Sequence, residues 1–574
     1  MLTSSCRRTL LAGLAACTLI SGCSSAPEPP QHSTPPPENN SSQTGPSSPA
    51  SPSLVARKLA RPEMAESVAA DAGAAVSSTR RALLLPPPVA QVDRERYAAF
   101  DDNPLRRAAE HPVSTFSVDV DTGAYANVRR LLNQGQLPRR DAVRVEEMIN
   151  YFDYQYEAPR EENRPFGLHT AIAPTPWNSR THLLQVGIQG WRPAGPIPPA
   201  NLVFLIDVSG SMNAPDKLPL LQSAMKLLVS ELDARDRVSI VVYAGAAGAV
   251  LEPTPGDQRA TINRAIDNLS AGGSTNGGAG IRLAYALAEQ GFIEQGVNRV
   301  LLASDGDFNV GTTDFRALLD LVERKRASGV ALTTLGFGSG NYNDHLVEQL
   351  SNHGNGNHAY IDNLSEARRV LVDNRAATLH TIASDVKIQI EFNPAAVSEY
   401  RLIGYENRAL RREDFNNDNV DAGEIGAGHS VTALYEVALV GDQAERMDAL
   451  RYGSAASATG NPAELAFLRL RYKPAGRSRS ELIEQPLLRR EIRALDQAPD
   501  ALRFAAAVAA FGQILRGGRH TEGYTHADVL QLAQAARGDD PDGRRGEFLQ
   551  LVKLAESLTT TARSDTVPQG RVNN

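Results

Sequence analysis

One stretch near the middle of the chain limits the possible folds more than any other. Residues 202–206 read Leu-Val-Phe-Leu-Ile and end abruptly at Asp207. Successive side chains of a strand point to opposite faces of its sheet, so a strand that is apolar at every position is typical of a parallel sheet covered on both faces. The stretch therefore predicts a strand that is buried on both faces in a parallel sheet.

Strand and helix patterns alternate after this stretch. The expected strands are 238–244, 300–303 and 331–336, and the expected helices are 217–232, 281–290 and 315–327. This alternation predicts an α/β, doubly wound, Rossmann-like sheet, in which ligands bind beyond the carboxyl ends of the strands. Three loops should meet at that edge, namely 207–211, 272–276 and 304–307.

The side chains of these loops share one kind of ligand atom. Asp207 and Asp305 supply carboxylates, and Ser209, Ser211 and Thr275 supply hydroxyls. An all-oxygen set suits a hard divalent cation, with Mg²⁺ expected and Mn²⁺ or Ca²⁺ as alternatives. Because the set holds few carboxylates, the bound cation would keep positive charge and an open position. An Asp or Glu carboxylate of a protein partner can complete that shell.

The motif Asp207-x-Ser209-x-Ser211, followed by Thr275 and Asp305 on later loops, resembles the metal-ion-dependent adhesion site (MIDAS) of von Willebrand factor type A (VWA) domains. The resemblance implies that the two serines and the threonine bind the metal directly. It also implies that the two aspartates bind it directly or through water.

Longer stretches resemble a bacterial family of VWA lipoproteins that carry one domain before and one after the VWA domain. These stretches are 114–121, 272–280 and 304–311. In the last stretch, Asp305 matches the metal-binding aspartate of the family, and Asp307 is the alternative. The resemblance implies an adhesion or protein-binding role and no catalysis. The alternatives are a docking or chaperone subunit that assists an envelope enzyme or ATPase, and a scaffold without a metal-gated contact.

The N-terminus resembles the signal peptide of a bacterial lipoprotein. Arg7 and Arg8 precede an apolar run, 10–16, that is too short to span a membrane. The sequence Ile-Ser-Gly-Cys at 20–23 resembles a lipobox, which implies that Cys23 is lipidated and becomes the new N-terminus. Ser24 then implies the outer membrane, with the protein facing the periplasm or the cell surface. The alternative is a cleaved signal peptide with an incidental cysteine.

Composition excludes several other functions. All 3 cysteines lie within the first 23 residues, so the rest of the chain has no thiol for a disulfide, a metal or catalysis. The 59 basic and 66 acidic residues lack the basic excess that nucleic-acid binding needs. The sequence has no phosphate-binding loop and no His-Glu-x-x-His motif. The glycines at 336, 338 and 340 lack the dinucleotide spacing and predict a turn.

The expected organisation follows from these patterns. It comprises a signal peptide (1–22), a disordered Pro/Ser-rich tether (23–95), an N-terminal domain (96–196), the VWA domain (197–375), a C-terminal β-plus-helical domain (376–560) and a tail (561–574). The flanking segments are expected to be α+β or β-sandwich, with a helical C-terminal part. We hypothesise that strands in 168–190 and 386–440 form one β-sandwich into which the VWA domain is inserted, since neither set alone makes a closed core.

Helices are expected at 501–515, 526–536 and 547–558, and the first should be buried because it is apolar nearly all round. The strand that carries Ile388 alternates apolar and polar residues, which predicts one buried and one exposed face.

Three further groups could in principle bind metals. Asp119 and Asp121 follow a short strand, and His345, His353 and His358 lie close in sequence. The acidic segment 414–424 starts like a calcium loop, but Asn419 stands where an EF-hand needs glycine, and Ile425 where it needs glutamate. We interpret these groups as a cap with a surface residue, as loop histidines and as an acidic turn.

The lipobox yields a direct test. We expect Cys23→Ser to release the protein from the membrane fraction, because no thiol remains after residue 23 to carry a lipid. Fractionation and immunoblotting measure the shift, and Cys17→Ser serves as the control. Retention of the Cys23→Ser protein on membranes would contradict lipidation at this residue.

Overall fold

The computed structural model describes residues 94–161, 163–193, 195, 197–273, 277–306, 315–448, 450, 461–521 and 523–566. The signal peptide, Cys23, nearly all of the tether and the end of the tail lie outside the described residues. Within the described residues, no helix combines the length and the apolar character that a membrane span requires.

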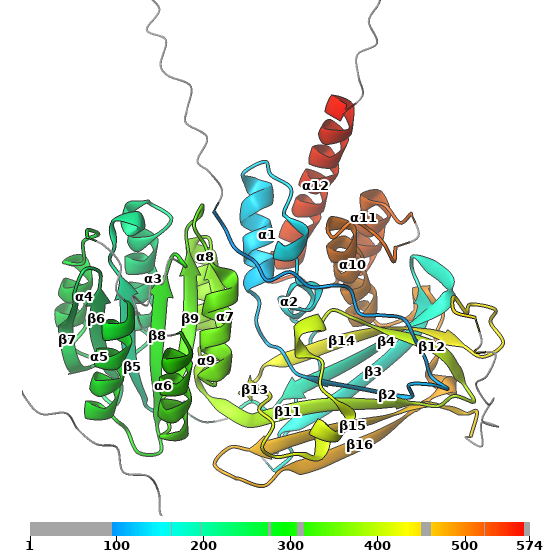
Figure 1. Ribbon diagram of the computed structural model, residues 1–574, viewed down its shortest axis with the longest axis horizontal. Coiled ribbons are helices and arrows are strands. Elements are labelled where there is room, and N and C mark those ends of the chain that lie inside the picture. The colour runs from blue at the N-terminus through cyan, green and yellow to red at the C-terminus, as the bar shows by residue number, and fades with distance from the viewer. Residues whose placement is uncertain are drawn as a thin grey trace, which may run out of the picture. The chain divides into compact units, whose positions relative to one another are not determined.

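The VWA domain is a six-stranded sheet with the order β10-β9-β8-β5-β6-β7, and Figure 1 shows helices on both of its sides. The strands are β5 (Ala200–Asp207), β6 (Arg237–Tyr243), β7 (Ala247–Pro255), β8 (Val297–Ser304), β9 (Ala331–Phe337) and β10 (His358–Ile361). The helices are α3 (Leu218–Ser230), α4 (Arg259–Asp267), α5 (Gly277–Gln290), α6 (Phe315–Ala327), α7 (Asp344–His353), α8 (Leu364–Arg368) and α9 (Arg375–Leu379). The predicted doubly wound fold is confirmed.

The apolar run of β5 is explained by burial on both faces. Leu202, Phe204 and Ile206 pack in one core with α3, α4 and α8. Val203 and Leu205 pack in a second core with α5, α6 and α7. All five side chains are fully buried. Burying such a side chain contributes roughly 1.5–3 kcal/mol, so β5 anchors both layers of helices.

One edge of this sheet differs from the sequence expectation. Strand β7 pairs antiparallel with β6, whereas the other neighbours are parallel. The burial of β7 is partial along its length, as an edge strand allows. The sequence of β7 shows no regular alternation of apolar and polar residues, because small Ala and Gly residues fill its first positions.

The flanking segments build a β-sandwich. One sheet has the order β1-β12-β14-β4-β3, and the other has the order β13-β11-β15-β16 with β2 paired to β11. The strands are β1 (Arg106–Arg107), β2 (Val113–Ser117), β3 (Phe166–Thr175), β4 (Asn178–Gly190), β11 (Thr381–Phe392), β12 (Val397–Ile403), β13 (Gly423–Gly426), β14 (Ser430–Leu439), β15 (Glu464–Pro474) and β16 (Glu481–Leu488).

The two flanking segments are joined in one fold. Strand β4, before the VWA domain, pairs antiparallel with β14, after it, and Val186 lies opposite Ala433. Residues of both sheets share one core, including Phe166, Ile388 and Leu468. The hypothesis of one sandwich with an inserted VWA domain is therefore confirmed.

The prediction that the polar face of β11 is exposed to solvent is wrong. Lys387 is 1% exposed and Gln389 is 5% exposed. Lys387 donates through Nζ to the carbonyl oxygens of Asp414 and Asn417 at 3.3 and 2.6 Å. Strand β11 lies between two other strands of its sheet. The segment around residue 415 covers the polar side chain of Lys387.

Helices from before and after the VWA domain share another core. They are α1 (Gly123–Asn133), α2 (Val145–Asn150), α10 (Asp500–Leu515), α11 (His526–Ala535) and α12 (Arg544–Thr566). The rings of Phe152, Phe504 and Phe548 lie 5.0–5.7 Å apart between centroids. Residues from Phe504 to Phe511 of α10 are all fully buried, as predicted. Helix α12 extends to Thr566, beyond the expected end at 558.

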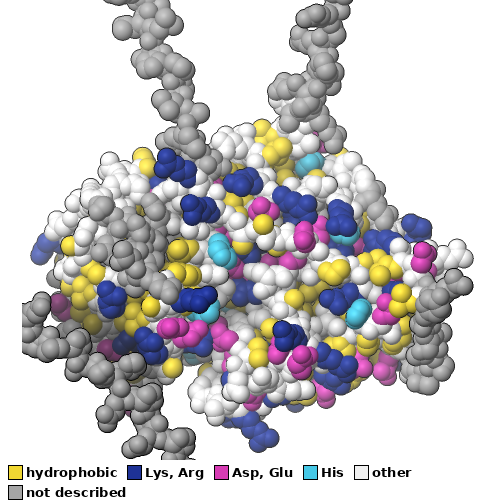
Figure 2. All heavy atoms as spheres, in the orientation of Figure 1, with side chains coloured by type: hydrophobic (Ala, Val, Ile, Leu, Met, Phe, Trp, Pro, Cys, Tyr) yellow, Lys and Arg dark blue, Asp and Glu magenta, His cyan; other side chains and the backbone are white. Residues whose placement is uncertain are grey.

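Surface charge is mixed. Figure 2 shows Lys and Arg side chains interspersed with Asp and Glu on the face that it presents. This agrees with the small net charge of −7 over the whole sequence.

Buried ion pairs connect the VWA domain to the helices. Arg129 of α1 donates through Nε to Asp362 at 2.8 Å, through Nη2 to Glu366 at 2.8 Å and through Nη1 to Glu547 at 3.1 Å. Burial alone would raise the pKa of Glu366, but the charges of Arg369 and Arg129 outweigh it and lower that pKa to about 2. Arg129 therefore links α1, the end of the VWA domain and α12.

Removing this guanidinium should destabilise the fold strongly. Arg129→Met leaves the buried Asp362 without its guanidinium partner and removes one of the two guanidinium groups that pair with Glu366, at an expected cost of about 3–5 kcal/mol. Urea unfolding followed by circular dichroism measures the loss. In the control, Arg235→Met, an exposed pair with Asp233 is removed and little change is expected. Similar midpoints for the two variants would show that Arg129 has no such role.

Candidate functional site

The loop after β5 lies at the carboxyl edge of the VWA sheet. The backbone N–H of Ser209 donates to Asp207 Oδ1 at 2.8 Å, which folds the loop back on the end of the strand. Gly210 N–H donates to Gly273 O at 3.1 Å, and Gly272 N–H donates to Val208 O at 2.7 Å. These bonds join the first two predicted loops.

The third loop reaches the same place. Strands β5 and β8 are parallel neighbours, so their ends lie side by side. Ser304 donates through its hydroxyl to Asp207 Oδ2 at 3.3 Å, and its oxygen accepts from Gly306 N–H at 3.1 Å. Ser304 was not among the predicted site residues, although it immediately precedes Asp305 in the sequence. The structure thus brings together the described parts of all three loops.

The oxygen atoms form a compact set with one open side. Ser209 Oγ and Ser211 Oγ lie 3.0 Å apart. Asp207 and Asp305 are fully buried and Ser209 is 2% exposed, whereas Ser211 is exposed. Thr275 and Asp307 lie outside the described residues. The four described residues that were predicted as ligands therefore lie together, and Ser211 faces solvent.

The two carboxylates of the site differ in their surroundings. Burial raises the pKa of Asp207 to about 6, although hydrogen bonds from Ser209 act in the opposite direction. Burial also acts to raise the pKa of Asp305, but the adjacent Lys217 ammonium outweighs it and lowers that pKa overall. Buried carboxylates beside hydroxyl groups are the ligand chemistry of a hard divalent cation, so the described residues fit such an ion.

Lys217 is a site residue that the sequence patterns did not reveal. Its Nζ donates to Asp305 Oδ2 at 2.9 Å and to Asn341 Oδ1 at 3.1 Å. The side chain is 8% exposed. Lys217 stands at the start of the predicted helix 217–232, where a lysine is ordinarily taken as a solvated residue.

The glycine-rich turn between β9 and α7 fits around this lysine. Gly338 has a φ of +72°, and a Cβ there would lie 2.3 Å from Lys217 Cε. A Cβ on Gly336 would lie 2.6 Å from the ring of Tyr342. Gly340 N–H donates to Glu95 Oε1 at 2.9 Å. Gly336 belongs to β9, and the predicted turn begins only after Phe337, at Gly338. The glycines make room for neighbouring side chains.

The interpretation of the two aspartates near the N-terminus as a cap and a surface residue is wrong about the surface residue, because Asp119 is 3% and Asp121 4% exposed and both form ion pairs. Arg408 Nε donates to Asp119 Oδ2 at 3.0 Å, and Arg408 Nη2 lies 3.5 Å from Asp121 Oδ2. Burial and the charge of Asp119 raise the pKa of Asp121 to about 7. Glu146 lies in the same buried group, and its pKa is raised to about 7 by burial and by Glu406, against the effect of Arg144.

The histidines do not come together, and their interpretation as loop histidines is wrong, because His345 and His353 lie in α7 and His358 is buried in β10. His358 is hydrogen-bonded to Tyr342 OH at 2.6 Å. His353 lies 2.7 Å from Glu323 Oε1, and His345 is hydrogen-bonded within its own helix. In the described part of the chain, no three His, Cys, Asp or Glu side chains gather so as to hold a metal.

The acidic segment 414–424 is held by protein cations. Lys387 binds two of its carbonyl oxygens, and Arg471 Nη2 donates to Asp418 Oδ1 at 2.9 Å. Asp418 stands at position five of the calcium-loop pattern, so Arg471 occupies one of the oxygens that a calcium ion would need. The interpretation as an acidic turn agrees with these contacts.

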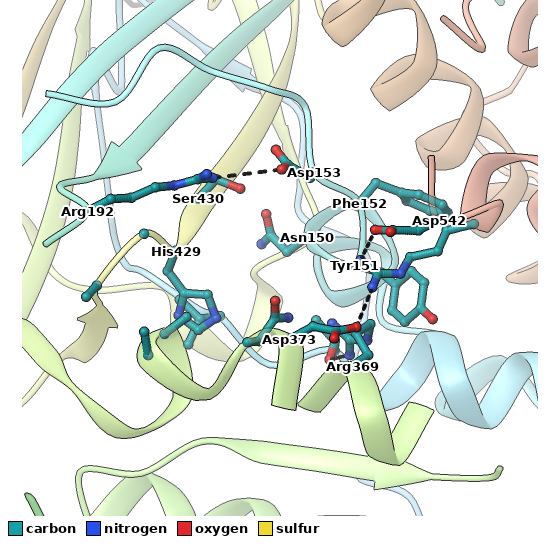
Figure 3. A pocket seen from close by; sticks show the side chains of 18 of the residues that line it. Asn150, Tyr151, Phe152, Asp153, Arg192, Arg369, Asp373, His429, Ser430 and Asp542 are labelled. Atoms are coloured by element: carbon teal, nitrogen blue, oxygen red, sulfur yellow. Dashed lines mark hydrogen bonds and ion pairs between the residues drawn. The ribbon is translucent and has the colours of Figure 1, made fainter. Parts of the chain in front are cut away.

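A cavity of about 660 Å³ lies elsewhere, where the chain passes between the sandwich and the VWA domain (Figure 3). Arg192 points toward Asp153 with 3.9 Å between Nη2 and Oδ2, and Arg544 Nη2 lies 3.5 Å from Asp373 Oδ2. Its wall mixes basic and acidic groups and includes none of the predicted metal ligands.

The doubly wound sheet and its serine-rich loop define a VWA protein, and the model of the von Willebrand factor type A domain matches residues 201–373. A von Willebrand factor model matches 91–185, and a model of the C-terminal region of the uncharacterized protein YfbK matches 377–558. The chain belongs to the bacterial VWA family that includes YfbK of Escherichia coli K12. It is 48% identical to YfbK over 480 residues, which cover 82% of this chain and 83% of YfbK.

More distant similarity covers only part of this chain. Inter-alpha-trypsin inhibitor heavy chain H3 of Mesocricetus auratus is 24% identical over 261 residues, 42% of this chain and 29% of that protein. The solved structure of a von Willebrand factor type A protein from Catenulispora acidiphila aligns with a TM-score of 0.39 and 14% identity, over 71% of this chain and 98% of that one. VWA domains mediate protein–protein interactions and commonly bind a divalent metal at their MIDAS.

The buried acid cluster gives a test that depends on pH. The pKa of Glu146 is about 7 in the folded protein against an ordinary 4.5, so the folded state binds the proton more tightly. The corresponding stability is lost as pH rises from 4.5 to 7. Glu146→Gln stays neutral, and we expect its free energy of unfolding to exceed that of wild type by on the order of 3 kcal/mol at pH 8 and by less than about 1 kcal/mol at pH 5.

Urea unfolding at both pH values measures this difference. The exposed Glu157 provides the control, because Glu157→Gln should shift the midpoint equally at pH 5 and pH 8. If Glu146→Gln also shifts it equally, Glu146 does not titrate as the structure indicates.

Proposed function

We propose that this protein is a lipid-anchored envelope protein that binds a protein partner through a divalent cation at its VWA domain. The observation that carries this proposal is the pair of hydroxyl oxygens, Ser209 Oγ and Ser211 Oγ, 3.0 Å apart beside the buried Asp207. Membership of the VWA family supports the interaction role, since VWA domains mediate protein–protein contacts.

The chain supplies the following ligands in this proposal. Ser209, Ser211 and the predicted Thr275 would hold the cation directly, and Asp207 and Asp305 would hold it directly or through water. Mg²⁺ is the expected ion, with Mn²⁺ and Ca²⁺ as alternatives. When bound, the cation supplies the positive charge that attracts a carboxylate oxygen. Ser211 is the exposed ligand, so a partner's Asp or Glu would approach from its side.

We propose a binding role without catalysis for this site. The hydroxyl of Ser209 contacts that of Ser211, and Asp207 accepts from Ser209 N–H and from Ser304. These contacts hold hydroxyl and carboxylate oxygen atoms close together, which suits coordination of a cation. The lipobox at 20–23 supports attachment to the envelope, on the outer membrane by the identity of Ser24.

Partner capture tests the proposal. We expect full-length protein to capture a partner from envelope extract in Mg²⁺, and we expect EDTA or Asp207→Ala to reduce the captured amount at least about tenfold, since a lost carboxylate ligand removes the cation. Asp257→Ala is the control, because Asp257 is an exposed aspartate that follows β7, at the opposite edge of the sheet. Mass spectrometry of the bound fraction identifies and quantifies the partner.

The outcomes separate the alternatives. Capture that is insensitive to EDTA and to Asp207→Ala would contradict a metal-gated contact and favour a scaffold. Capture of an envelope ATPase or hydrolase whose activity rises with this protein would favour the docking or chaperone role.

A further inference from the structure

We propose that Lys217 is a built-in counter-cation of the metal site, which lowers the affinity of the site for a free divalent cation and keeps the loaded site positively charged. This inference rests on the proposed function and adds a residue that sets its charge. Lys217 contacts Asp305 and Asn341 and is not itself a metal ligand. It therefore acts on the metal through its position beside Asp305 and through its charge.

The position of the ammonium is fixed by three segments. Lys217 lies at the N-terminal end of α3, Asp305 follows β8, and Asn341 belongs to the turn after β9. The aliphatic part of Lys217 passes over Gly338, where a Cβ would lie 2.3–2.7 Å from three of its carbon atoms. A side chain that is packed in this way cannot move aside without opening the turn.

Burial makes this charge effective. Lys217 is 8% exposed at its side chain, and Asp305 is fully buried. Water and salt screen charges poorly in such surroundings, so an ammonium beside Asp305 opposes a divalent cation strongly. The carboxylate is also hydrogen-bonded by Ser211 and Asn341, which keeps it in place.

The charge balance of the site follows from these residues. Asp207 and Asp305 carry two negative charges and Lys217 carries one positive charge, so the described site has a net charge of about −1 when both acids are ionised. A divalent cation would bring it to about +1, and a partner's carboxylate would bring it to about zero. Without Lys217 the loaded site would already be neutral. The lysine therefore makes the partner's carboxylate the group that completes neutralisation.

Metal titration of the purified full-length protein tests the proposal, with Mn²⁺ alone and Mg²⁺ alone as probes in isothermal calorimetry. We expect Lys217→Gln, which keeps a hydrogen-bond donor without the charge, to bind at least about tenfold more tightly than wild type. Lys217→Arg, which keeps the charge, should stay within about threefold. Lys226→Gln is the matched control, since Lys226 lies on the same helix and pairs with the exposed Asp267.

A second variant covers the case in which Lys217→Gln does not fold, as judged by circular dichroism. Asn341→Asp keeps the shape of the side chain and neutralises the ammonium in place, and it should also tighten Mn²⁺ binding. Unchanged or weaker binding in the folded variants, with wild type binding normally, overturns the role of Lys217 and leaves the proposed function intact. If wild type and every variant fail to bind either ion, the proposed function fails and this inference fails with it.

Discussion

The contact on which the arrangement of the described residues depends is the buried guanidinium of Arg129. It binds Asp362 and Glu366 at the end of the VWA domain and Glu547 of α12. An apolar contact tolerates sliding, whereas a buried guanidinium satisfies its carboxylates in few geometries. Because α1 also packs against β10, this cluster fixes the edge strand of the VWA sheet relative to helices α1 and α12.

The described chain begins beside the candidate metal site. Arg94 N–H donates to Gly340 O, and Arg96 N–H donates to Tyr342 O, so this first segment pairs with the turn that carries Asn341. Glu95 accepts from Gly340 N–H and also pairs with Arg130 of α1. The turn that packs around Lys217 is thus held on its other side by the segment where the predicted tether ends.

The parts of the fold that were predictable are those with a local signature. The apolar strand β5 and the nearly all-apolar helix α10 show their burial in consecutive residues, and the strands and helices of the VWA domain alternate visibly along the sequence. The described ligands were predictable because Asp207, Ser209 and Ser211 lie in one loop. Lys217 was not, because its partner Asp305 is 88 residues away and nothing near Lys217 in the sequence marks it. The buried polar face of β11 was missed for the same reason, since Lys387 is satisfied by a separate segment.

The chain passes from the sandwich into the VWA domain after β4 and returns before β11. One loop of the sandwich is hydrogen-bonded to the chain at both places. Gly428 N–H donates to Trp191 O just after β4, and Ala427 N–H donates to His380 O just before β11. A Cβ on Gly426 would lie 1.7 Å from Ala377 O, so the returning chain packs directly on this loop. Both connections between the sandwich and the VWA domain are therefore hydrogen-bonded to the sandwich near residues 426–429. A shift of the VWA domain on partner binding would have to break these bonds or the Arg129 cluster, so the structure favours a site whose response is confined to its own loops and to the turn around Lys217.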